Sequence, residues 1–235
     1  MGEALVLLAI DTATRYVSIA LYDASGVLAE RSWLSGGSHS VEVLPAIADM
    51  LAQARLTPEA LNAVAVVRGP GSFTGLRIGM SIAKGLCLAL DIPIVSIPTL
   101  EVMAYAVGDP GGRVIAVLEA GRGRICVATY RYQEGLPVQE GDVELVKSSE
   151  WVVQATEPLL ITGEVSAELA EQLLRQPDAG NITISSLASS LRRAGYLAEL
   201  AWERLQRGDV DNLDTLSPVY THYPDLKVTK DEARP

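Results

Sequence analysis

A short polar turn, Asp11-Thr12-Ala13-Thr14, directly follows an apolar run near the start of the chain. A carboxylate and hydroxyl groups in such a turn can meet a phosphate group and the metal ion bound to it. The same residue types are also common in turns because their side chains hydrogen-bond to the local backbone. Asp11 and Thr12 are therefore the candidate nucleotide-binding residues, and an ordinary turn is the alternative.

A second glycine-containing turn, Gly121-Arg122-Gly123, lies between two strand-like runs in the second half of the chain. It falls in the most basic local region, which contains Arg113, Arg122, Arg124 and Arg131. The turn could bind phosphate or simply close a hairpin. A solvated charged face explains the arginines equally well.

Other kinds of site are disfavoured by the sequence. The chain has two histidines, His39 and His222, which excludes a multi-histidine zinc site, and we expect both at the surface. No G-x-S-x-G pattern supports a hydrolase nucleophile. Cys87 and Cys126 fall in an apolar helix and a strand-like run, so no disulfide framework is indicated. We predict no catalytic residue and no metal site.

The most distinctive segment runs from Arg68 to Gly79 and reads Arg-Gly-Pro-Gly-Ser-Phe-Thr-Gly-Leu-Arg-Ile-Gly. Its glycines and proline fit a tight turn, because glycine adopts backbone angles that other residues avoid. The turn would connect a strand over residues 63–67 to a helix over residues 74–90. Ser72 or Thr74 could cap that helix.

The helix after this turn is nearly free of charge. Arg77, Ser81 and Lys84 share one narrow face, and the other faces are apolar or small. Small residues recur at intervals of four, which lets another backbone come close: Gly75, Gly79 and Ala83. The pattern fits an ordinary core helix, or a helix packed between its own core and a partner protein.

A preceding helix is predicted over residues 39–55. One apolar face is formed by Leu44, Ile47, Ala48 and Leu51. A second apolar stripe, formed by Val43, Ala46 and Met50, lies on a side that should otherwise be polar. Scattered surface apolar residues, which are normal in folded proteins, explain the second stripe.

Apolar runs bounded by polar turns predict strands over residues 4–10, 16–22, 27–33, 63–67, 94–97, 114–118, 125–132 and 159–162. Helical periodicity predicts helices over residues 39–55, 74–90, 99–107, 166–175 and 187–206. Residues 108–112 read as a linker. We therefore expect two α/β halves of similar plan, residues 1–107 and 108–222, and a polar tail, residues 223–235.

The composition is that of a globular protein, since 49% of the 235 residues are hydrophobic. The formal net charge of −10 argues against binding nucleic acid directly, because phosphate binding depends on clustered Lys and Arg. The first apolar run is too short for a membrane span or a signal peptide. With two cysteines and no disulfide framework, these features predict a cytoplasmic protein without membrane attachment.

Four strings of residues together resemble the TsaB family, formerly called YeaZ, a subunit of the bacterial machinery that makes threonylcarbamoyladenosine in tRNA. They are Ile10 to Thr14, Arg68 to Gly79, Leu90-Asp91-Ile92-Pro93 with Pro98-Thr99-Leu100, and Pro218-Val219-Tyr220. The resemblance spans the chain, and the string Arg-Gly-Pro-Gly-Ser-Phe-Thr-Gly is its specific part.

The resemblance implies an actin-like ATPase fold of two RNase-H-like halves. It also implies a catalytic paralog, TsaD, with an H-x-x-x-H metal motif whose two ligand positions fall on Thr99 and Met103 here. Neither side chain replaces a neutral imidazole at a hard metal centre. Glu119 and Arg124 also depart from the family pattern near a second phosphate loop. The resemblance thus implies a paralog that kept the fold and lost the active site, with ATP and metal held by TsaD.

The resemblance further implies docking on TsaD through the two N-terminal helices, residues 39–55 and 74–90. We therefore predict a partner interface formed by Val43, Ala46, Met50, Gly75, Gly79 and Ala83. A TsaE-type ATPase is expected to join through the complex, and TsaD is expected to hold the tRNA. The same apolar face could pair with a second copy and give a homodimer.

The leading hypothesis is a non-catalytic partner that binds and activates TsaD, which would transfer the threonylcarbamoyl group to the adenosine beside the tRNA anticodon. The alternative is an autonomous ATPase or small-molecule kinase of the same fold, with Asp11 at the metal-bound phosphate. A protease has the least support, because the sequence offers neither metal ligands nor a credible nucleophile and base.

Overall fold

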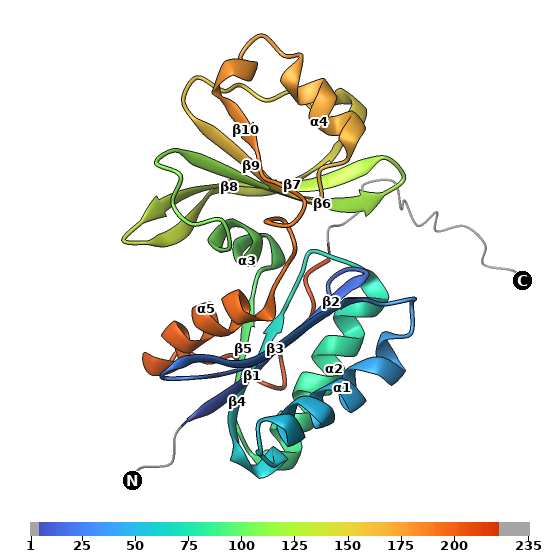
Figure 1. The fold of residues 1–235 in the computed structure, drawn as a ribbon, viewed down its shortest axis with the longest axis vertical. Coiled ribbons are helices and arrows are strands. Elements are labelled where there is room, and N and C mark those ends of the chain that lie inside the picture. Colours follow the sequence, from blue (N-terminus) through green and yellow to red (C-terminus); the bar gives the residue numbers. More distant parts are fainter. Residues whose placement is uncertain (1–4, 221–235) are drawn as a thin grey trace, which may run out of the picture.

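The computed structural model describes residues 5–220, which form two α/β halves stacked one above the other (Figure 1). Each half contains a five-stranded sheet, and the sheets share one plan. Three antiparallel strands come first, and two strands parallel to the first of them complete each sheet. This repeat agrees with the two expected halves. The expected tail, residues 223–235, and His222 lie outside the described residues.

The first sheet has the spatial order β3-β2-β1-β4-β5 and consists of β1 (Val6–Asp11), β2 (Tyr16–Asp23), β3 (Gly26–Leu34), β4 (Leu61–Val67) and β5 (Ile94–Ile97). All six residues of β1 are buried, because the strand is central and helices cover both faces of the sheet. Leu8 and Ile10 point to one face, while Leu7 and Ala9 point to the other. Asp11 is thus carried to the end of a fully buried strand.

The second sheet has the spatial order β10-β9-β6-β7-β8 and consists of β6 (Arg113–Gly121), β7 (Arg124–Gln133), β8 (Leu136–Lys147), β9 (Leu159–Gly163) and β10 (Ile182–Ile184). The sequence did not predict β8 or β10. Most residues of β8 are exposed or half-buried, so no buried apolar face marks it, and β10 has only three residues. Gly121-Arg122-Gly123 is the hairpin turn between β6 and β7.

The described residues contain α1 (His39–Gln53), α2 (Phe73–Leu90), α3 (Thr99–Tyr105), α4 (Ala167–Leu174) and α5 (Ala194–Gln206), with short 3₁₀ turns at Pro58–Ala60, Ser148–Glu150 and Ala179–Asn181. Helices α1 and α2 cover one face of the first sheet, and α5 covers the other (Figure 1). Helix α3 packs on the inner face of the second sheet and α4 on its outer face. The sheets are therefore each enclosed by helices.

The second half was expected to include residues 108–222, but α5 belongs with the first sheet. Ala194, Leu197 and Ala201 share a buried cluster with Ala9, on β1. Small residues on both surfaces allow this close packing. The helix also begins at Ala194 rather than at residue 187. The chain therefore crosses back to the first half through the segment that contains Arg192.

Helix α2 begins as predicted at a serine cap: the Ser72 hydroxyl accepts a hydrogen bond from the Gly75 N–H at 3.2 Å. The helix ends at Asp91, whose φ of 54° lies in the left-handed region. Among the described residues, α2 is the one helix long and apolar enough to cross a membrane, yet a core helix passes the same test. Its inner side packs on the first sheet and contributes Met80, Ala83 and Cys87 to the core.

Candidate functional site

A cleft of about 1200 Å³ lies between the two halves. The turn after β1 and the start of α2 line it from the first half, with Thr14 and Phe73 among the side chains. The β6–β7 hairpin and the end of β9 line it from the second half, with Glu119 and Glu164. Arg192 lies at its inner end. This cleft gathers both turns that the sequence marked as possible phosphate sites.

Asp11 and Thr12 directly precede the residues of this turn that line the cleft, which begin at Ala13, and each is 1% exposed. One carboxylate oxygen of Asp11 accepts a hydrogen bond from the Ala13 N–H at 2.9 Å. The Thr12 hydroxyl donates to the Gly75 carbonyl at 2.8 Å. Both candidate nucleotide-binding side chains are therefore already engaged within the chain.

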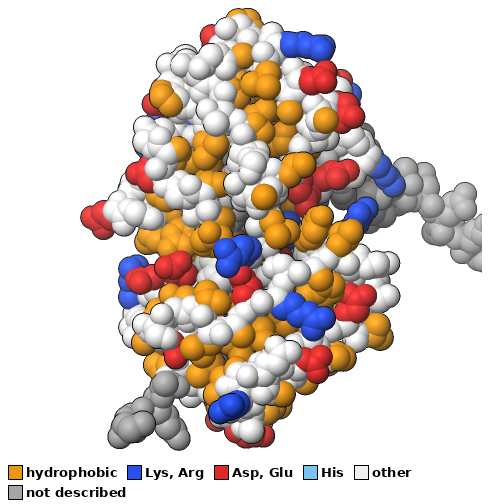
Figure 2. Space-filling view, viewed as in Figure 1, with side chains coloured by type: hydrophobic (Ala, Val, Ile, Leu, Met, Phe, Trp, Pro, Cys, Tyr) orange, Lys and Arg blue, Asp and Glu red, His pale blue; other side chains and the backbone are white. Residues whose placement is uncertain are grey.

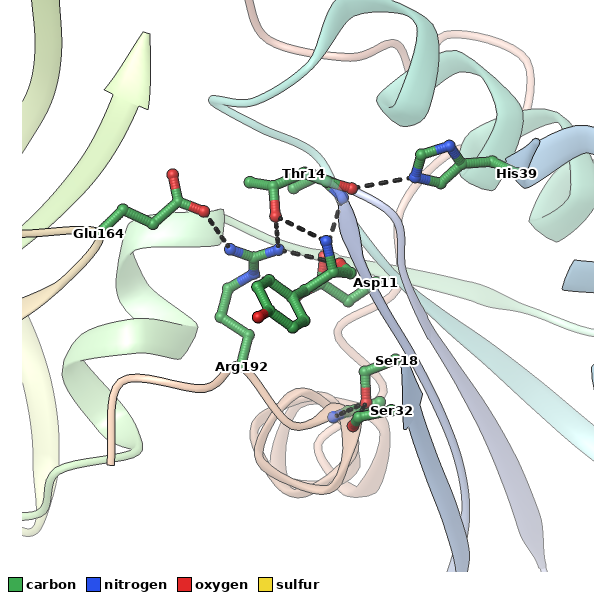
Figure 3. A network of polar contacts seen from close by, with 10 residues as sticks. Asp11, Thr14, Ser18, Ser32, His39, Glu164 and Arg192 are labelled. Carbon is green, nitrogen blue, oxygen red and sulfur yellow. Dashed lines mark hydrogen bonds and ion pairs between the residues drawn. The ribbon is translucent and has the colours of Figure 1, made fainter. Parts of the chain in front are cut away.

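The sequence did not predict that Arg192 would be the partner of Asp11. The Arg192 Nε atom lies 2.9 Å from the Asp11 carboxylate, and its side chain is 4% exposed. The same guanidinium donates to the Thr14 hydroxyl at 2.5 Å and the Tyr16 carbonyl at 3.2 Å. Figure 3 shows the guanidinium between these groups and Glu164, which lies 3.4 Å away. A fixed cation thus occupies the position beside Asp11.

The electrostatics of this network keep Arg192 charged. Burial disfavours its charged form, but Asp11 and then Glu164 outweigh that effect and raise the pKa of the guanidinium. Asp11 already has a buried counter-charge, so a metal-bound phosphate would have to displace an ion pair to reach it. No signal in the sequence could join these residues, which are 181 positions apart.

His39 lies beside this network rather than at the surface. It is 7% exposed, and its Nε2 atom is 3.0 Å from the Thr14 carbonyl (Figure 3). The expectation of a surface histidine was therefore wrong for His39. The first residue of α1 instead holds the turn after β1 in place.

The glycine-rich turn serves close packing within the chain. Gly69 has a φ of 111°, and a Cβ atom on Gly71 would collide with the Ala13 carbonyl. The Ser72 N–H donates to that carbonyl at 2.6 Å, and the Val219 N–H donates to the Arg68 carbonyl at 2.6 Å. The most specific string of the sequence thus joins the turn after β1 to the closing Pro218-Val219-Tyr220 string.

The six predicted interface residues are all buried within this chain: Val43, Ala46, Met50, Gly75, Gly79 and Ala83. The apolar stripe on α1 faces the sheet, and the glycines of α2 face Thr12. These side chains pack within the chain and leave no exposed apolar surface of their own for the predicted partner interface. The open face of α1 and α2 instead carries Val41, Leu44, Phe73 and Leu88, each at least 48% exposed.

The positions corresponding to the metal ligands of TsaD are also buried here. Thr99 is 0% exposed and Met103 is 3% exposed. The Met103 methyl group packs so tightly against Gly163 that a Cβ atom there would collide with it. The described residues contain no group of three or more His, Cys, Asp or Glu side chains that could hold a metal ion.

Two halves of one plan around a cleft are the features of an actin-like ATPase fold, and solved structures support this class. YeaZ from Pseudomonas aeruginosa superposes with a TM-score of 0.78 at 26% identity, over 92% of this chain and 100% of that chain. Component A of the Acidaminococcus fermentans (R)-2-hydroxyglutaryl-CoA dehydratase gives 0.51 at 11% identity, over 86% and 99%, and shows the fold alone.

Sequence comparisons then define the family. The TsaB protein of Bacillus subtilis is 32% identical over 212 residues, which cover 89% of this chain and 92% of that protein. The TsaB protein of Escherichia coli is 38% identical over 130 residues, 54% and 56% of the two chains. Residues 34–139 also match the family model of TsaD, described as tRNA N6-adenosine threonylcarbamoyltransferase. The chain belongs to the TsaB family.

Proposed function

We propose that this chain is a non-catalytic subunit that binds and activates TsaD during threonylcarbamoyladenosine formation in tRNA. Its relatives are named tRNA threonylcarbamoyladenosine biosynthesis proteins, and its residues 34–139 match the model of the transferase. A chain that resembles both the subunit and the enzyme is well suited to pair with that enzyme through a shared fold. The pairing would take place in the cytoplasm.

The open apolar face of α1 and α2 is the observation that carries the proposal. Val41 and Leu88 are each 69% exposed, and only 33% of the residues of α2 are buried, although the helix is strongly apolar. Large apolar side chains left exposed on two helices that contact each other are typical of an interaction site. The face also includes Arg77, which stacks 3.9 Å above the Phe73 ring and can provide a polar contact at the rim.

The Asp11–Arg192 ion pair supports a role without catalysis. An autonomous ATPase or kinase would need Asp11 at a metal-bound phosphate, where Arg192 already lies. Glu119 and Arg124, which depart from the family pattern, flank the β6–β7 turn across the cleft. We therefore assign ATP, metal and the transfer reaction to TsaD, and we expect no ATP binding by the isolated chain in titration calorimetry with magnesium.

The proposed relations to tRNA, to a TsaE-type ATPase and to a second copy follow from the net charge of the chain and from its open α1–α2 face. With a net charge of −10, the chain would reach tRNA only through TsaD. A TsaE-type ATPase would join across the shared surface. In the absence of TsaD, two copies would pair through the α1–α2 face, and dissociation of that homodimer would accompany TsaD binding.

The test is the affinity for TsaD of a variant with a charge on this face. Leu88→Glu should weaken binding about 30-fold or more, because a carboxylate would be buried in an apolar contact. Val152→Glu is the matched control, since Val152 is 71% exposed in the other half and should bind within about twofold of the wild type. Equal binding of Leu88→Glu and the wild type would overturn the proposal.

A further inference from the structure

A second hollow, of about 500 Å³, lies where the end of α3, the β7–β8 turn and the start of α5 meet. On the face drawn in Figure 2, hydrophobic side chains gather at this level beside acidic and basic ones, where α3 faces α5 in Figure 1. Three tyrosines and two carboxylates line the hollow: Tyr105, Tyr132, Tyr196, Asp109 and Glu199. Neither the large cleft nor the α1–α2 face includes any of them.

The tyrosine rings are fixed in place. The rings of Tyr105 and Tyr196 meet edge to face, with centroids 6.1 Å apart and an interplanar angle of 82°. The Tyr132 hydroxyl donates to the Ala104 carbonyl at 2.7 Å. All three side chains are half-buried, so part of each ring stays open to the hollow. The aromatic walls therefore exist before any ligand enters.

Acidic side chains make the electrostatic potential in this hollow negative. Burial and then Glu199 raise the pKa of Tyr105 to about 12, and burial and then Asp109 raise the pKa of Tyr132. Within residues 5–220, no Lys or Arg lines the hollow. Arg193 lies 5.7 Å from the centre of the Tyr196 ring, but Glu30 pairs with it at 2.5 Å. Asp109 and Glu199 thus place two carboxylates beside three π-systems, and Glu199 also accepts a hydrogen bond from Tyr105.

We propose that this hollow binds a small organic ammonium ion. Aromatic faces attract ammonium groups through the ring quadrupole, and carboxylates add a Coulombic attraction. The volume suits a small molecule. The described residues form no group of three or more His, Cys, Asp or Glu side chains that could hold a metal ion here, whereas tyrosine rings favour the alkyl groups of an organic cation. Since the lining comes from both halves, the ligand would bridge them.

The test is titration of the full chain with choline and with spermidine, followed by calorimetry and amide chemical shifts. The neutral control is 3,3-dimethylbutanol, which has the shape of choline without its charge. We expect choline or spermidine to bind at least tenfold more tightly than the neutral control, with shifts confined to α3, α5 and the β7–β8 turn. Choline carries a methylated ammonium group and spermidine carries protonated amines, so their relative affinities show which kind of cation the hollow prefers.

Single substitutions in and beside the hollow test the proposal in a chain that still folds. Tyr105→Leu removes a ring and should weaken cation binding about fivefold to tenfold, and Glu199→Gln should weaken it similarly. Glu203→Gln removes the same charge from the same helix outside the hollow, and should weaken binding less than Glu199→Gln does, because Glu203 acts on Tyr105 only through its charge. Equal binding of cation and neutral control, or shifts elsewhere in the chain, would overturn the proposal. So would equal affinities of Glu199→Gln and Glu203→Gln.

Discussion

At the residue scale, the ion pair between Asp11 and Arg192 decides whether a metal-bound phosphate can reach the Asp11 carboxylate. The sequence predicts that a polar turn containing Asp11 follows a buried strand, because the apolar run of β1 fixes where the strand ends. Its partner lies 181 positions away, in a segment that was expected to be helical. Local patterns carry no information on such a pairing, so the sequence could single out Asp11 but not Arg192.

Loss of Arg192 should strongly destabilise the fold. Arg192→Met leaves the Asp11 carboxylate buried without its counter-charge, which costs about 3–5 kcal/mol. The neighbouring Arg193 is the matched control, since its side chain is 52% exposed and pairs with Glu30 near the surface. Arg193→Met should cost less than about 1 kcal/mol. Urea unfolding of both variants measures the difference, and equal losses would contradict the assigned role of Arg192.

Glu101, on α3, gives a pH-dependent prediction. Burial raises its pKa above the ordinary value of 4.5, although Arg68 and Arg204 oppose the shift. A carboxyl group with a raised folded-state pKa supports stability fully below its unfolded pKa and loses that support as the pH rises through the folded value. Glu101→Gln should therefore be more stable than the wild type at pH 7, with the gain disappearing below about pH 4.5. A pH-independent difference in the free energy of unfolding would contradict this cause.

At the element scale, α2 shows what a sequence pattern can and cannot predict. The recurrence of Gly75, Gly79 and Ala83 predicts that another backbone comes close, and one does. That backbone belongs to Thr12 of the same chain rather than to a partner. The spacing of small residues determines how closely something can approach, but it does not identify what approaches.

Two alanine substitutions on α2 distinguish the effect of close packing on stability from the effect of helix propensity. A Cβ atom on Gly75 would collide with the Thr12 carbonyl, so Gly75→Ala should destabilise the fold by about 1–3 kcal/mol. Gly85 has nothing within 4 Å of an added Cβ atom. Gly85→Ala should be neutral or stabilise by up to about 1 kcal/mol. Thermal unfolding tests both, and a harmless Gly75→Ala would contradict the packing argument.

The sequence left open which side of α1 packs against the sheet, for a physical reason. Its two apolar stripes are adjacent on the helix surface, and together they are wider than the face that the sheet covers. The structure centres the buried face on Val43, Ile47 and Met50 and leaves Leu44 exposed. The bounds of α1 and α2 were predicted within a few residues, whereas α5 begins later than predicted and the sequence offered no comparable pattern for the mostly exposed β8.

At the scale of the whole molecule, the architecture separates a closed core from an open face. The return of α5 to the first sheet closes one side of that sheet, while α1 and α2 close the other and leave apolar side chains outside. The cleft between the halves contains a buried cation held by residues of both. This arrangement favours a subunit that acts through a surface rather than through a reaction in its own cleft.

The most direct test is threonylcarbamoyl transfer to tRNA by purified TsaD, with threonylcarbamoyl-adenylate supplied, with and without this chain. Product should form when both proteins are present, and this chain alone should give none. Leu88→Glu should lower the yield in proportion to its lost binding, while Val152→Glu should not. Full activity of TsaD without this chain, or product formation by this chain alone, would contradict the account.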